Sequence, residues 1–406
     1  MVSARFLSQV SARINQAKAA ELGGTPAVFG KVNVIFLGDF GQLPPVRATA
    51  LFAHSAVSKI TENTSGTPIG ISNLFGAALW RMVNVVVILR KNWRAASDPR
   101  FTNLLARIRI GRAWEGSAPH LDDQIGDGRN YKDSDFKVLQ SRLIQTMSPQ
   151  VRAEFKDAPI VVSTKVSRDL INRKLVKEYA NQSNKVMHDY CANDRFNKTR
   201  VSGETRTRLW QIRSSISKDA IGLLPLVPGM KVMVTENVAI KAKVVNGQEG
   251  VLVEVKYDVD DSGNRFAKCA YVHIPGSGIQ VHGQAPDVVP ILPVTTSFLY
   301  NSFSISRTQL PLLPAYAYTD YKSQGRSLKK VIIDLSTCKS LQSVYVMLSR
   351  ATSLDAIAVL RQFEPKKIFK RMAQEFRDEF SRLDGLDAAT TQRWTESRTN
   401  EASAPY

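Results

Sequence analysis

The chain has 406 residues, of which 43% are hydrophobic, and it carries a formal net charge of +19. This length and composition allow two or three domains with cores of their own. No apolar run approaches the roughly 20 residues that a membrane-spanning helix needs, which argues against a transmembrane role. Three widely separated cysteines (Cys191, Cys269 and Cys338) lack the paired spacing of a metal site, so we expect reduced thiols in an intracellular protein.

The positive charge is concentrated in the middle of the sequence. Residues 89–235 carry a net charge of +12, against +4 for 1–88, −1 for 236–311, +4 for 312–363 and 0 for 364–406. A localised basic surface releases counterions when it meets phosphates, so nucleic acid is the expected partner. The alternative is a basic surface without a ligand, as in ribosomal-type proteins.

Two interpretations fit the beginning of the chain. The first twenty residues hold three basic and no acidic residues, with Phe6, Val10 and Ile14 at helical spacing. A mitochondrial targeting peptide has this composition. We favour the second interpretation, an amphipathic helix inside a domain, and infer no targeting from it.

Residues 32–46 combine a predicted strand with a polar loop. The run from Val32 to Leu37 is short, apolar and rich in β-branched residues, which predicts a buried strand. The sequence G-D-F-G-Q-L-P-P-V follows at 38–46. It places the Asp39 carboxylate and the Gln42 amide at the carboxyl end of that strand, where open α/β sheets bind ligands. A plain proline-rich turn has the same composition.

The following segments predict the end of one α/β domain and the start of the next. Apolar residues at 71–82 have helical spacing, and residues 85–89 predict another buried strand. From Phe101 to Ile108 the spacing predicts a helix that ends at Gly111.

A further strand and helix are predicted near residue 160. The β-branched run 160–162 predicts a strand, and Ser167 is a plausible cap of the helix that carries Leu170, Ile171 and Leu175.

Residues 236–311 change to a pattern typical of β-structure. Apolar residues alternate over 251–257, the sequence D-D-S-G-N at 260–264 predicts a turn, and the alternation resumes at Tyr271 and His273. This pattern predicts an all-β insertion.

The α/β pattern returns at Pro314. Strands are expected at 331–335 and 356–360, with a helix at 342–350 between them. This alternation is typical of a doubly wound sheet.

One more helix is predicted after residue 363. Ile368, Met372, Phe376 and Phe380 have helical spacing, and the polar tail from Asp384 is expected to be disordered.

Five sequence strings resemble, in order, motifs of the Pif-type DNA helicases, superfamily-one motors related to RecD. They are G-D-F-G-Q-L-P-P-V at 38–46, L-R-K-N-W-R at 89–94, the pair P-G-M-K-V-M at 228–233 and N-G-Q-E-G at 246–250, A-Y-A-Y-T-D-Y-K-S-Q-G at 315–325, and Y-V-M-L-S-R-A at 345–351. Each string alone is weak, but five in the family's order over most of the chain make chance agreement improbable.

The phosphate-binding loop of such a motor is missing from this sequence. None of the 406 residues forms a G-x-x-x-x-G-K-[ST] string. Met1 aligns with the last residue of the family's second motif, D-E-x-S-M, so the resemblance implies that the phosphate-binding Lys and the Mg²⁺-binding acidic pair lie upstream. We therefore expect the carboxy-terminal two-thirds of a helicase.

The resemblance implies an α/β fold, a RecA-like P-loop helicase core. Residues 1–88 would end a truncated first RecA-like domain, whose open sheet predicts poor solubility for the isolated chain. Residues 89–235 and 312–363 would form the second domain, interrupted by a small Src-homology-three-type β-barrel at 236–311. A helix and a disordered tail would occupy 364–406.

Candidate catalytic residues follow from the motifs. The resemblance implies that Gln42 orients the attacking water or senses the γ-phosphate, and that Arg94 and Arg350 act as arginine fingers. Asp39 would contribute to the nucleotide site or hold the loop through backbone hydrogen bonds. The family commonly has His or Phe where this chain has Trp93, which puts the register around Arg94 in doubt.

The fifth motif supplies candidate contacts to nucleotide and DNA. Gly325 and Gln324 would lie at the nucleotide, because glycine lets the backbone approach a phosphate. Hydroxyl, ammonium and amide groups suit phosphate contacts without base readout. The DNA contacts implied here are Thr319, Lys322, Ser323, Asn172 and Asn246.

A basic segment with a tryptophan offers a further candidate. Trp210 lies among Arg206, Arg208 and Arg213, a mixture suited to stacking on single-stranded DNA. A solvated loop around a buried tryptophan has the same composition.

As a whole, the sequence predicts part of an ATP-dependent 5′→3′ DNA helicase that uses ATP and Mg²⁺ in repair, recombination or telomere maintenance. Its partners would be single-stranded DNA, duplex junctions and the missing amino-terminal part, and its place the nucleus, with the mitochondrion as the alternative. The isolated chain would not hydrolyse ATP. The alternative function is a non-catalytic DNA-binding remnant or split helicase half, for instance from a mobile element.

Overall fold

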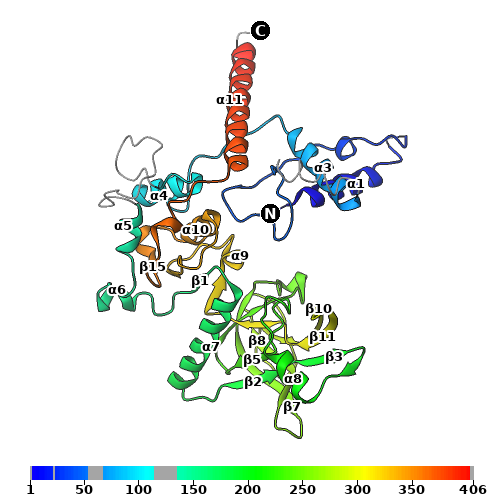
Figure 1. Cartoon of the computed structure of the whole chain (residues 1–406), viewed down its shortest axis with the longest axis vertical. Helices are drawn as coiled ribbons and strands as arrows, with labels where there is room; N and C mark the ends of the chain where they lie inside the picture. Colours follow the sequence, from blue (N-terminus) through cyan, green and yellow to red (C-terminus); the bar gives the residue numbers. More distant parts are fainter. Residues whose placement is uncertain (1, 22, 54–66, 114–134, 403–406) are drawn as a thin grey trace. The chain divides into compact units, whose positions relative to one another are not determined.

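The computed structural model describes residues 2–21, 23–53, 67–113 and 135–402 (Figure 1). By their contacts these form two compact units. The first comprises residues 1–141, 339–354 and 363–406, and the second residues 142–338 and 355–362. Met1 and the last residues of the tail, 403–406, lie outside the described residues. The predicted domain boundaries remain a prediction.

Two helices form the core at the amino-terminal end of the first unit. Helix α1 (Ala4–Ala17) confirms the predicted internal helix, and α3 (Pro68–Arg81) confirms the helix predicted near 71–82. Ser3 and Thr67 cap them through side-chain oxygens that accept backbone N–H groups. Gly76 lets the helices meet closely, because a Cβ there would lie 1.8 Å from the Ala4 carbonyl oxygen.

The predicted strands at 32–37 and 85–89 are wrong. Neither segment is a strand, and the side chains of Ile35, Leu37 and Leu89 are 86%, 91% and 86% exposed. All strands among the described residues lie in the second unit. An apolar run becomes a strand only when a neighbouring strand pairs with its backbone, and the described residues of the first unit form no such strand.

The remaining helices of the first unit follow the apolar spacing more closely. Helix α4 (Pro99–Ile110) ends, as predicted, at Gly111, which adopts the left-handed conformation (φ 75°). Helix α10 (Leu341–Leu348) matches the predicted helix at 342–350. The other short elements are α5 (Asp135–Gln140) and the 3₁₀ turns η1 (Val28–Lys31) and η5 (Pro365–Lys367).

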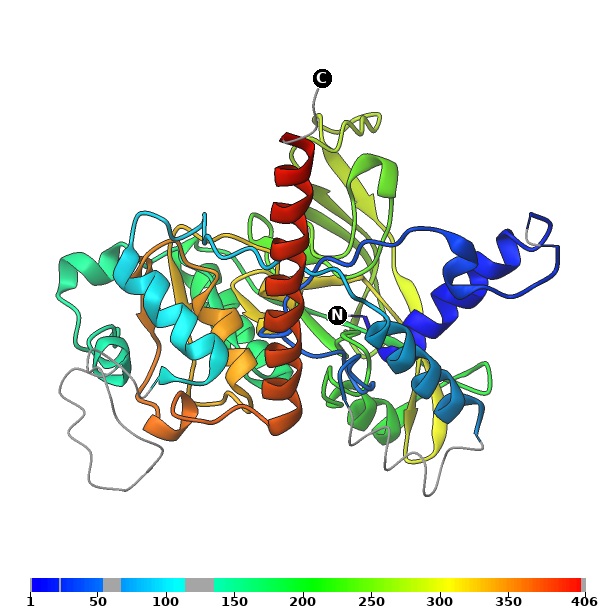
Figure 2. The same ribbon diagram turned by 90° about the horizontal axis from the view of Figure 1, so that it is seen from above.

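Helix α11 spans Gln374–Ala402 as one uninterrupted helix (Figure 2). The prediction of a disordered tail from Asp384 is therefore wrong over 384–402. Side chains of α11 bond to the backbone beside it: Asp387 accepts the Ile88 N–H at 2.8 Å, and Thr390 accepts the Val86 N–H at 3.1 Å. These contacts order a segment that its composition alone would leave unfolded.

A parallel four-stranded sheet organises the second unit, in the order β13-β1-β14-β15. Its strands are β1 (Ile160–Val162), β13 (Ala317–Thr319), β14 (Val331–Ile333) and β15 (Ile357–Val359). Strands β1, β14 and β15 confirm the strands predicted at 160–162, 331–335 and 356–360. Helix α7 (Lys165–Gln182) follows β1, and the single-turn α9 (Asp320–Ser323) follows β13. Thr164 rather than Ser167 caps α7, accepting the Ser167 N–H at 3.1 Å.

The second unit also contains a seven-stranded, mostly antiparallel sheet. Strands β12-β6-β7-β8-β2-β5 follow one another, and β9 pairs with β8. Their bounds are β2 (His188–Cys191), β5 (Leu223–Leu226), β6 (Lys231–Val234), β7 (Glu249–Val259), β8 (Arg265–His273), β9 (Val288–Ile291) and β12 (Leu312–Pro314). This sheet therefore includes strands that precede and follow the predicted insertion at 236–311. In sequence, its first strand begins at His188.

A smaller antiparallel sheet has the order β10-β11-β3-β4. It consists of β3 (Asn193–Phe196), β4 (Thr199–Arg200), β10 (Val294–Tyr300) and β11 (Phe303–Gln309). Helix α8 (Gly203–Trp210) contributes Leu209 to the cluster on one face of this sheet. The remaining elements are α6 (Pro149–Ala153), η3 (Ile240–Ala242) and η4 (Leu354–Ala356).

The predicted hairpin forms, and the fully buried residue at the start of β7 is Leu252. Strands β7 and β8 pair around the turn at 260–264, where the Asp260 N–H donates to the Asn264 carbonyl at 3.0 Å. Val251 and Val253 are 40% and 41% exposed, whereas Leu252 between them is fully buried. One intervening leucine thus decides which face packs, because strand side chains alternate.

A buried ion pair joins the small sheet to its surroundings. Arg307 and Asp194 are both fully buried and bond through two nitrogens at 2.7 and 2.8 Å. Arg307 also donates to the carbonyls of Leu209 and Ala220. Since a buried charge is costly without a partner, this set of contacts fixes the strands and α8 together.

Replacing Gly76 by alanine should separate α1 from α3. The added Cβ would collide with the Ala4 backbone, so we expect a loss of about 2 kcal/mol or more in the free energy of unfolding, measured by urea denaturation. Gly385→Ala is the matched control: nothing lies within 4 Å of a Cβ there. It should stabilise α11 by about 0.5–1 kcal/mol. Equal effects of the two substitutions would contradict the close packing of α1 and α3.

Candidate functional site

The two predicted arginine fingers lie together in the first unit. Arg94 donates from Nη1 to the Ser349 carbonyl at 2.8 Å, and Arg350 donates from Nη2 to the Ser349 hydroxyl at 2.7 Å. Arg350 also donates from Nε to the Val346 carbonyl at 2.8 Å. Ser349, the residue that follows α10, thus brings together two guanidinium groups that are far apart along the chain.

These two cations repel each other. The pKa of Arg350 is lowered to about 10, chiefly by burial and also by the neighbouring Arg94, against an opposing effect of Tyr345. Arg350 is only 2% exposed. An anion placed against both guanidinium groups would relieve this repulsion, because each can donate two hydrogen bonds to one phosphate.

The Asp39 carboxylate organises the loop at 38–46. Its Oδ1 accepts the Gly41 N–H at 2.9 Å, and Gln42 approaches Oδ2 at 3.4 Å. Arg109 of α4 donates to Oδ1 through Nε and Nη2 at 3.0 and 2.8 Å. Of the two roles predicted for Asp39, the structure supports the second: it holds the loop that carries Gln42.

Tyr345 connects this loop with the two arginines. Its pKa is raised to about 12, first by burial and then by the charge and hydrogen bond of Asp39; Arg109 and Arg350 oppose the rise. A side chain on α10 therefore lies within reach of Asp39 and Arg350 together. Through Tyr345 and Ser349, the structure thus joins Gln42, Arg94 and Arg350 in one connected set of contacts.

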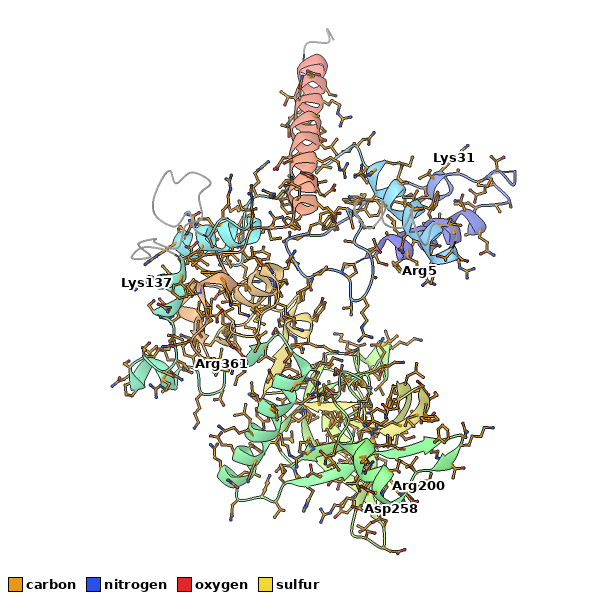
Figure 3. All side chains as sticks on the ribbon, viewed as in Figure 1. Arg5, Lys31, Lys137, Arg200, Asp258 and Arg361 are labelled. Carbon is orange, nitrogen blue, oxygen red and sulfur yellow. The ribbon has the colours of Figure 1, made fainter. Side chains whose placement is uncertain are left out.

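In the second unit, polar residues gather at the carboxyl ends of the parallel strands. Val162 pairs with Thr319, so the loops after β1 and β13 leave the same edge. There the Ser163 hydroxyl donates to Thr337 at 2.7 Å. Arg361, which is labelled in Figure 3, pairs with the buried Asp334 at 2.6 Å. This is the edge at which parallel α/β sheets bind ligands.

The residues of the fifth motif divide between internal and accessible positions. Thr319 caps α9 and is 6% exposed, and Ser323 is 1% exposed and donates to the Asp320 carbonyl. We therefore correct these two from DNA contacts to residues that shape the loop. Gly325 has φ 86° with open space around it, as a close backbone approach requires, and Gln324 is half-buried beside it.

Lys322 is the half-buried cation of this loop. Its pKa is lowered, chiefly by burial and also by Arg168 and Lys165, while Asp219 and Glu236 oppose the shift. Its ammonium group donates to the Asn246 side chain, so the loop at 246–250 and the fifth motif meet.

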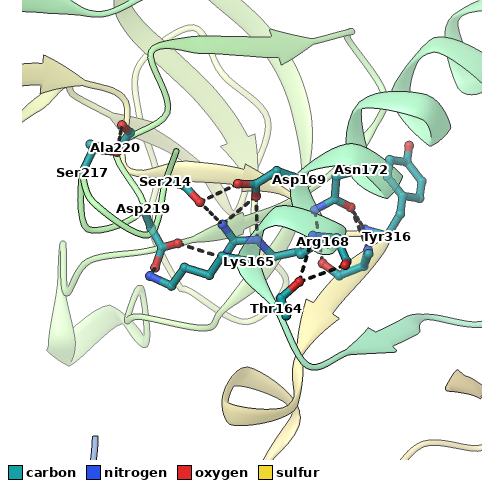
Figure 4. A network of polar contacts seen from close by, with 12 residues as sticks. Thr164, Lys165, Arg168, Asp169, Asn172, Ser214, Ser217, Asp219, Ala220 and Tyr316 are labelled. Carbon is teal, nitrogen blue, oxygen red and sulfur yellow. Dashed lines mark hydrogen bonds and ion pairs between the residues drawn. The ribbon is translucent and has the colours of Figure 1, made fainter. Parts of the chain in front are cut away.

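Asn172 is a positioning residue in this structure. It is 2% exposed; its amide donates to the Ala317 carbonyl at 3.2 Å and accepts the Ala317 and Tyr316 N–H groups at 2.7 and 3.3 Å (Figure 4). All three bonds go to the backbone at β13. The predicted DNA contact is therefore corrected: Asn172 fixes α7 against the strand that leads into the fifth motif.

Trp210 also has an internal role. It is 8% exposed, its indole N–H donates to the Ala192 carbonyl at 2.8 Å, and Arg206 lies 4.9 Å from its ring centre. A ring so enclosed cannot stack on a DNA base, so the alternative of a buried tryptophan is the correct one.

The sequence reasoning missed a charged network at the start of α7. Arg168 is fully buried and pairs with Asp219 at 2.8 Å and with Asp169 at 2.6 Å (Figure 4). Lys165 pairs with Asp219 at 2.7 Å, and its side chain is 34% exposed. The available signal was the position of Lys165, directly after a strand and its capping residue, where side chains reach the carboxyl edge.

Metal and membrane signals are both absent from the described part of the chain. Within it, no group of three or more His, Cys, Asp or Glu side chains is placed to hold a metal ion. None of its helices is long and apolar enough to cross a bilayer.

The known proteins that are similar to this chain belong to the group that the motifs resemble. No protein-family model matches the chain. The chain is 24% identical over 377 residues to ATP-dependent DNA helicase PIF1 of Xenopus laevis, covering 91% of this chain and 46% of that protein. It is 28% identical over 366 residues to the same helicase of Mus musculus, covering 90% and 44%. The chain thus spans about half the length of the curated relatives it matches.

Solved structures of the same group share the fold. The Pif1 helicase of Candida albicans superposes with a TM-score of 0.57 at 18% identity, covering 93% of this chain and 74% of that one. The Pif1 helicase from Bacteroides in complex with ADP-AlF3 and ssDNA superposes with a TM-score of 0.60 at 20% identity, covering 94% and 72%. The fold is that of a RecA-like helicase core. Within that class, the chain is homologous to the Pif1 ATP-dependent DNA helicases over about nine-tenths of its length.

The acid sensitivity of the second unit should depend on Asp219. Burial acts to raise its pKa, but Arg168 and Lys165 outweigh burial and leave it below the ordinary 3.8. The pairing therefore stabilises the fold above about pH 4 and is lost as the pH falls through the lower folded value. We expect Asp219→Asn to cost about 2–3 kcal/mol at pH 7, with the difference from wild type shrinking below pH 4 in urea titrations. A difference independent of pH would contradict this.

Proposed function

We propose that this chain is the part of an ATP-dependent 5′→3′ DNA helicase that supplies the arginine fingers and a surface for single-stranded DNA. The observation that carries the proposal is the connected set Arg94, Arg350, Tyr345, Asp39 and Gln42 in the first unit. Gln42 and the two arginines would face the γ-phosphate of bound ATP·Mg²⁺. The nucleotide and its Mg²⁺ supply the phosphoryl group and neutralise the developing charge.

The residues fit a transferring phosphoryl group. Two guanidinium groups that repel each other in its absence gain most when a multiply charged anion arrives, since the anion pairs with both. The Gln42 amide, held at the Asp39 carboxylate, offers a donor and an acceptor for a water molecule. In this proposal Arg94 and Arg350 stabilise charge, while Asp39 and Tyr345 set the position of the loop.

DNA would bind along the carboxyl edge of the parallel sheet in the second unit. Lys165 and Lys322 present ammonium groups there, next to the hydroxyls of Ser163 and Thr337. Such donors contact phosphates without reading bases, which suits a motor that follows a strand of any sequence. Solved relatives described as bound to ssDNA and to forked dsDNA support this choice of partner.

Binding to single-stranded DNA should be steeply salt-dependent and should lose one contact in Lys322→Ala. We expect the slope of log K against log salt to become shallower by about 0.7, measured by fluorescence anisotropy with an oligothymidine. Lys256→Ala is the control, because that side chain is 60% exposed on β7 and pairs with Glu254. If the two variants lower the slope equally, the DNA does not follow the predicted edge.

The same contact should titrate. Because burial lowers the pKa of Lys322 from the ordinary 10.5, its charge is lost at a lower pH than that of an exposed lysine. Its contribution to affinity is therefore complete at neutral pH and declines as the pH rises toward 10. Lys322→Arg, which stays charged, should keep its affinity over this range. A wild-type affinity as flat with pH as that of the arginine variant would contradict the shift.

A second candidate function is a DNA-binding helicase half without turnover of its own, which would use the same cations Lys165 and Lys322. Both candidates predict that the purified chain shows no DNA-stimulated ATP hydrolysis. Turnover that disappears in Arg350→Ala would show that this chain binds the nucleotide without an upstream segment. If adding a protein that carries the phosphate-binding motif restores turnover, the first proposal holds; the second holds if it does not.

A further inference from the structure

We propose that helix α11 controls the position of the Gln42 loop, and that Arg109 and Phe380 are the positioning residues that transmit this control. The inference rests on the proposed function for the role of Gln42, but its physical content is a coupling within the first unit. It assigns a role to the carboxy-terminal helix, to which the sequence motifs gave none.

Arg109 is held between the loop and α11. Its guanidinium donates twice to Asp39 Oδ1, and the same guanidinium lies 4.8 Å from the ring centre of Phe380 on α11. The side chain also packs against the loop backbone: a Cβ on Gly41 would come within 2.7 Å of Arg109 Cγ. Without the Phe380 ring, one face of the Arg109 guanidinium would lose its packing partner. The guanidinium could then rotate away from Asp39.

A chain of aromatic rings makes a second connection between the same two elements. Phe40, next to Asp39, packs edge-on against Phe52 at 4.9 Å, and Phe52 packs against Phe376 at 6.0 Å. Phe376 stacks on Phe380 at 4.3 Å. Two routes therefore connect the loop to α11, a charged one from Asp39 through Arg109 and an apolar one from Phe40 through Phe52. A shift of the helix would displace both.

The first turns of α11 are anchored at the other end of this cluster. Trp80 packs against Phe40 at 5.3 Å and donates its indole N–H to Glu379 Oε1 at 2.8 Å. Glu379 is only 2% exposed and also pairs with Arg382 at 2.9 Å. Since a buried carboxylate needs its partners, this contact fixes the rotation of α11 that directs Phe380 toward Arg109.

The consequence is a loop whose order depends on a helix remote in sequence. With α11 seated, Arg109 holds the Asp39 carboxylate where it accepts the Gly41 N–H and approaches the Gln42 amide. With α11 displaced, Asp39 loses its charged partner on α4 and the loop opens. Any ligand that draws α11 away would thereby loosen Gln42 without touching the nucleotide.

Hydrogen exchange of the peptide that contains Gly41 and Gln42 tests the coupling on the full chain. We expect exchange about tenfold faster in Phe380→Ala and in Arg109→Gln, because each removes support for a hydrogen bond to a charged group. Phe380→Tyr keeps the ring and should restore slow exchange. Arg100→Gln is the matched control for Arg109→Gln, because Arg100 lies at an exposed position of the same helix, α4. It should leave exchange unchanged.

Exchange in the α1 peptide separates local coupling from unfolding. The proposal is overturned if the peptide with Gly41 and Gln42 still exchanges slowly in both Phe380→Ala and Arg109→Gln. It is also overturned if the α1 peptide of these variants exchanges faster by the same factor as the loop peptide. Binding to single-stranded DNA, measured on the same samples, tests the proposed function independently. Loop coupling in a chain that binds no DNA supports this inference and contradicts the helicase assignment.

Discussion

The carboxylate of Asp39 is the constraint on which the arrangement of the first unit depends. One oxygen accepts a backbone N–H of its own loop and two N–H groups of Arg109, and the carboxylate also bonds to Tyr345 on α10. A half-buried carboxylate is stable only while hydrogen-bond donors of this kind surround it. Because those partners come from α4, α10 and the loop itself, one carboxylate fixes Gln42 relative to the helix end that carries Arg350.

Buried polar groups serve the same purpose in the second unit. Asn172 bonds to the backbone at β13, Arg168 joins α7 to the loop that carries Asp219, and Arg307 joins β11 to β3 and α8. Each side chain is 2% exposed or less, so it can direct a functional loop but cannot itself touch DNA. The accessible cations Lys165 and Lys322 lie at the sheet edge that these interior residues hold in place.

Sequence reasoning was accurate where local chemistry decides the structure. Gly111 ends α4 because only a left-handed residue closes that helix, and the turn at 260–264 joins β7 to β8. It failed where a partner far along the chain decides. Residues 32–37 and 85–89 have the apolar pattern of buried strands, but many of their side chains are exposed. An apolar pattern shows that a segment could form a strand, but not that a partner strand is available to pair with it. Asn172 and Trp210 read as DNA contacts because residue type does not reveal burial.

The sequence by itself determined the order of the motifs, the fold class and the identity of the residues suited to phosphate. Those features follow from residue type and spacing, which are local properties of a chain. Only the tertiary structure decided that Arg94 meets Arg350 at Ser349, that Asp39 is shared between Arg109 and Tyr345, and that α11 packs beside the Gln42 loop. These contacts join residues that are distant along the chain, and they form because a buried charge or ring must find its partner wherever the fold brings one.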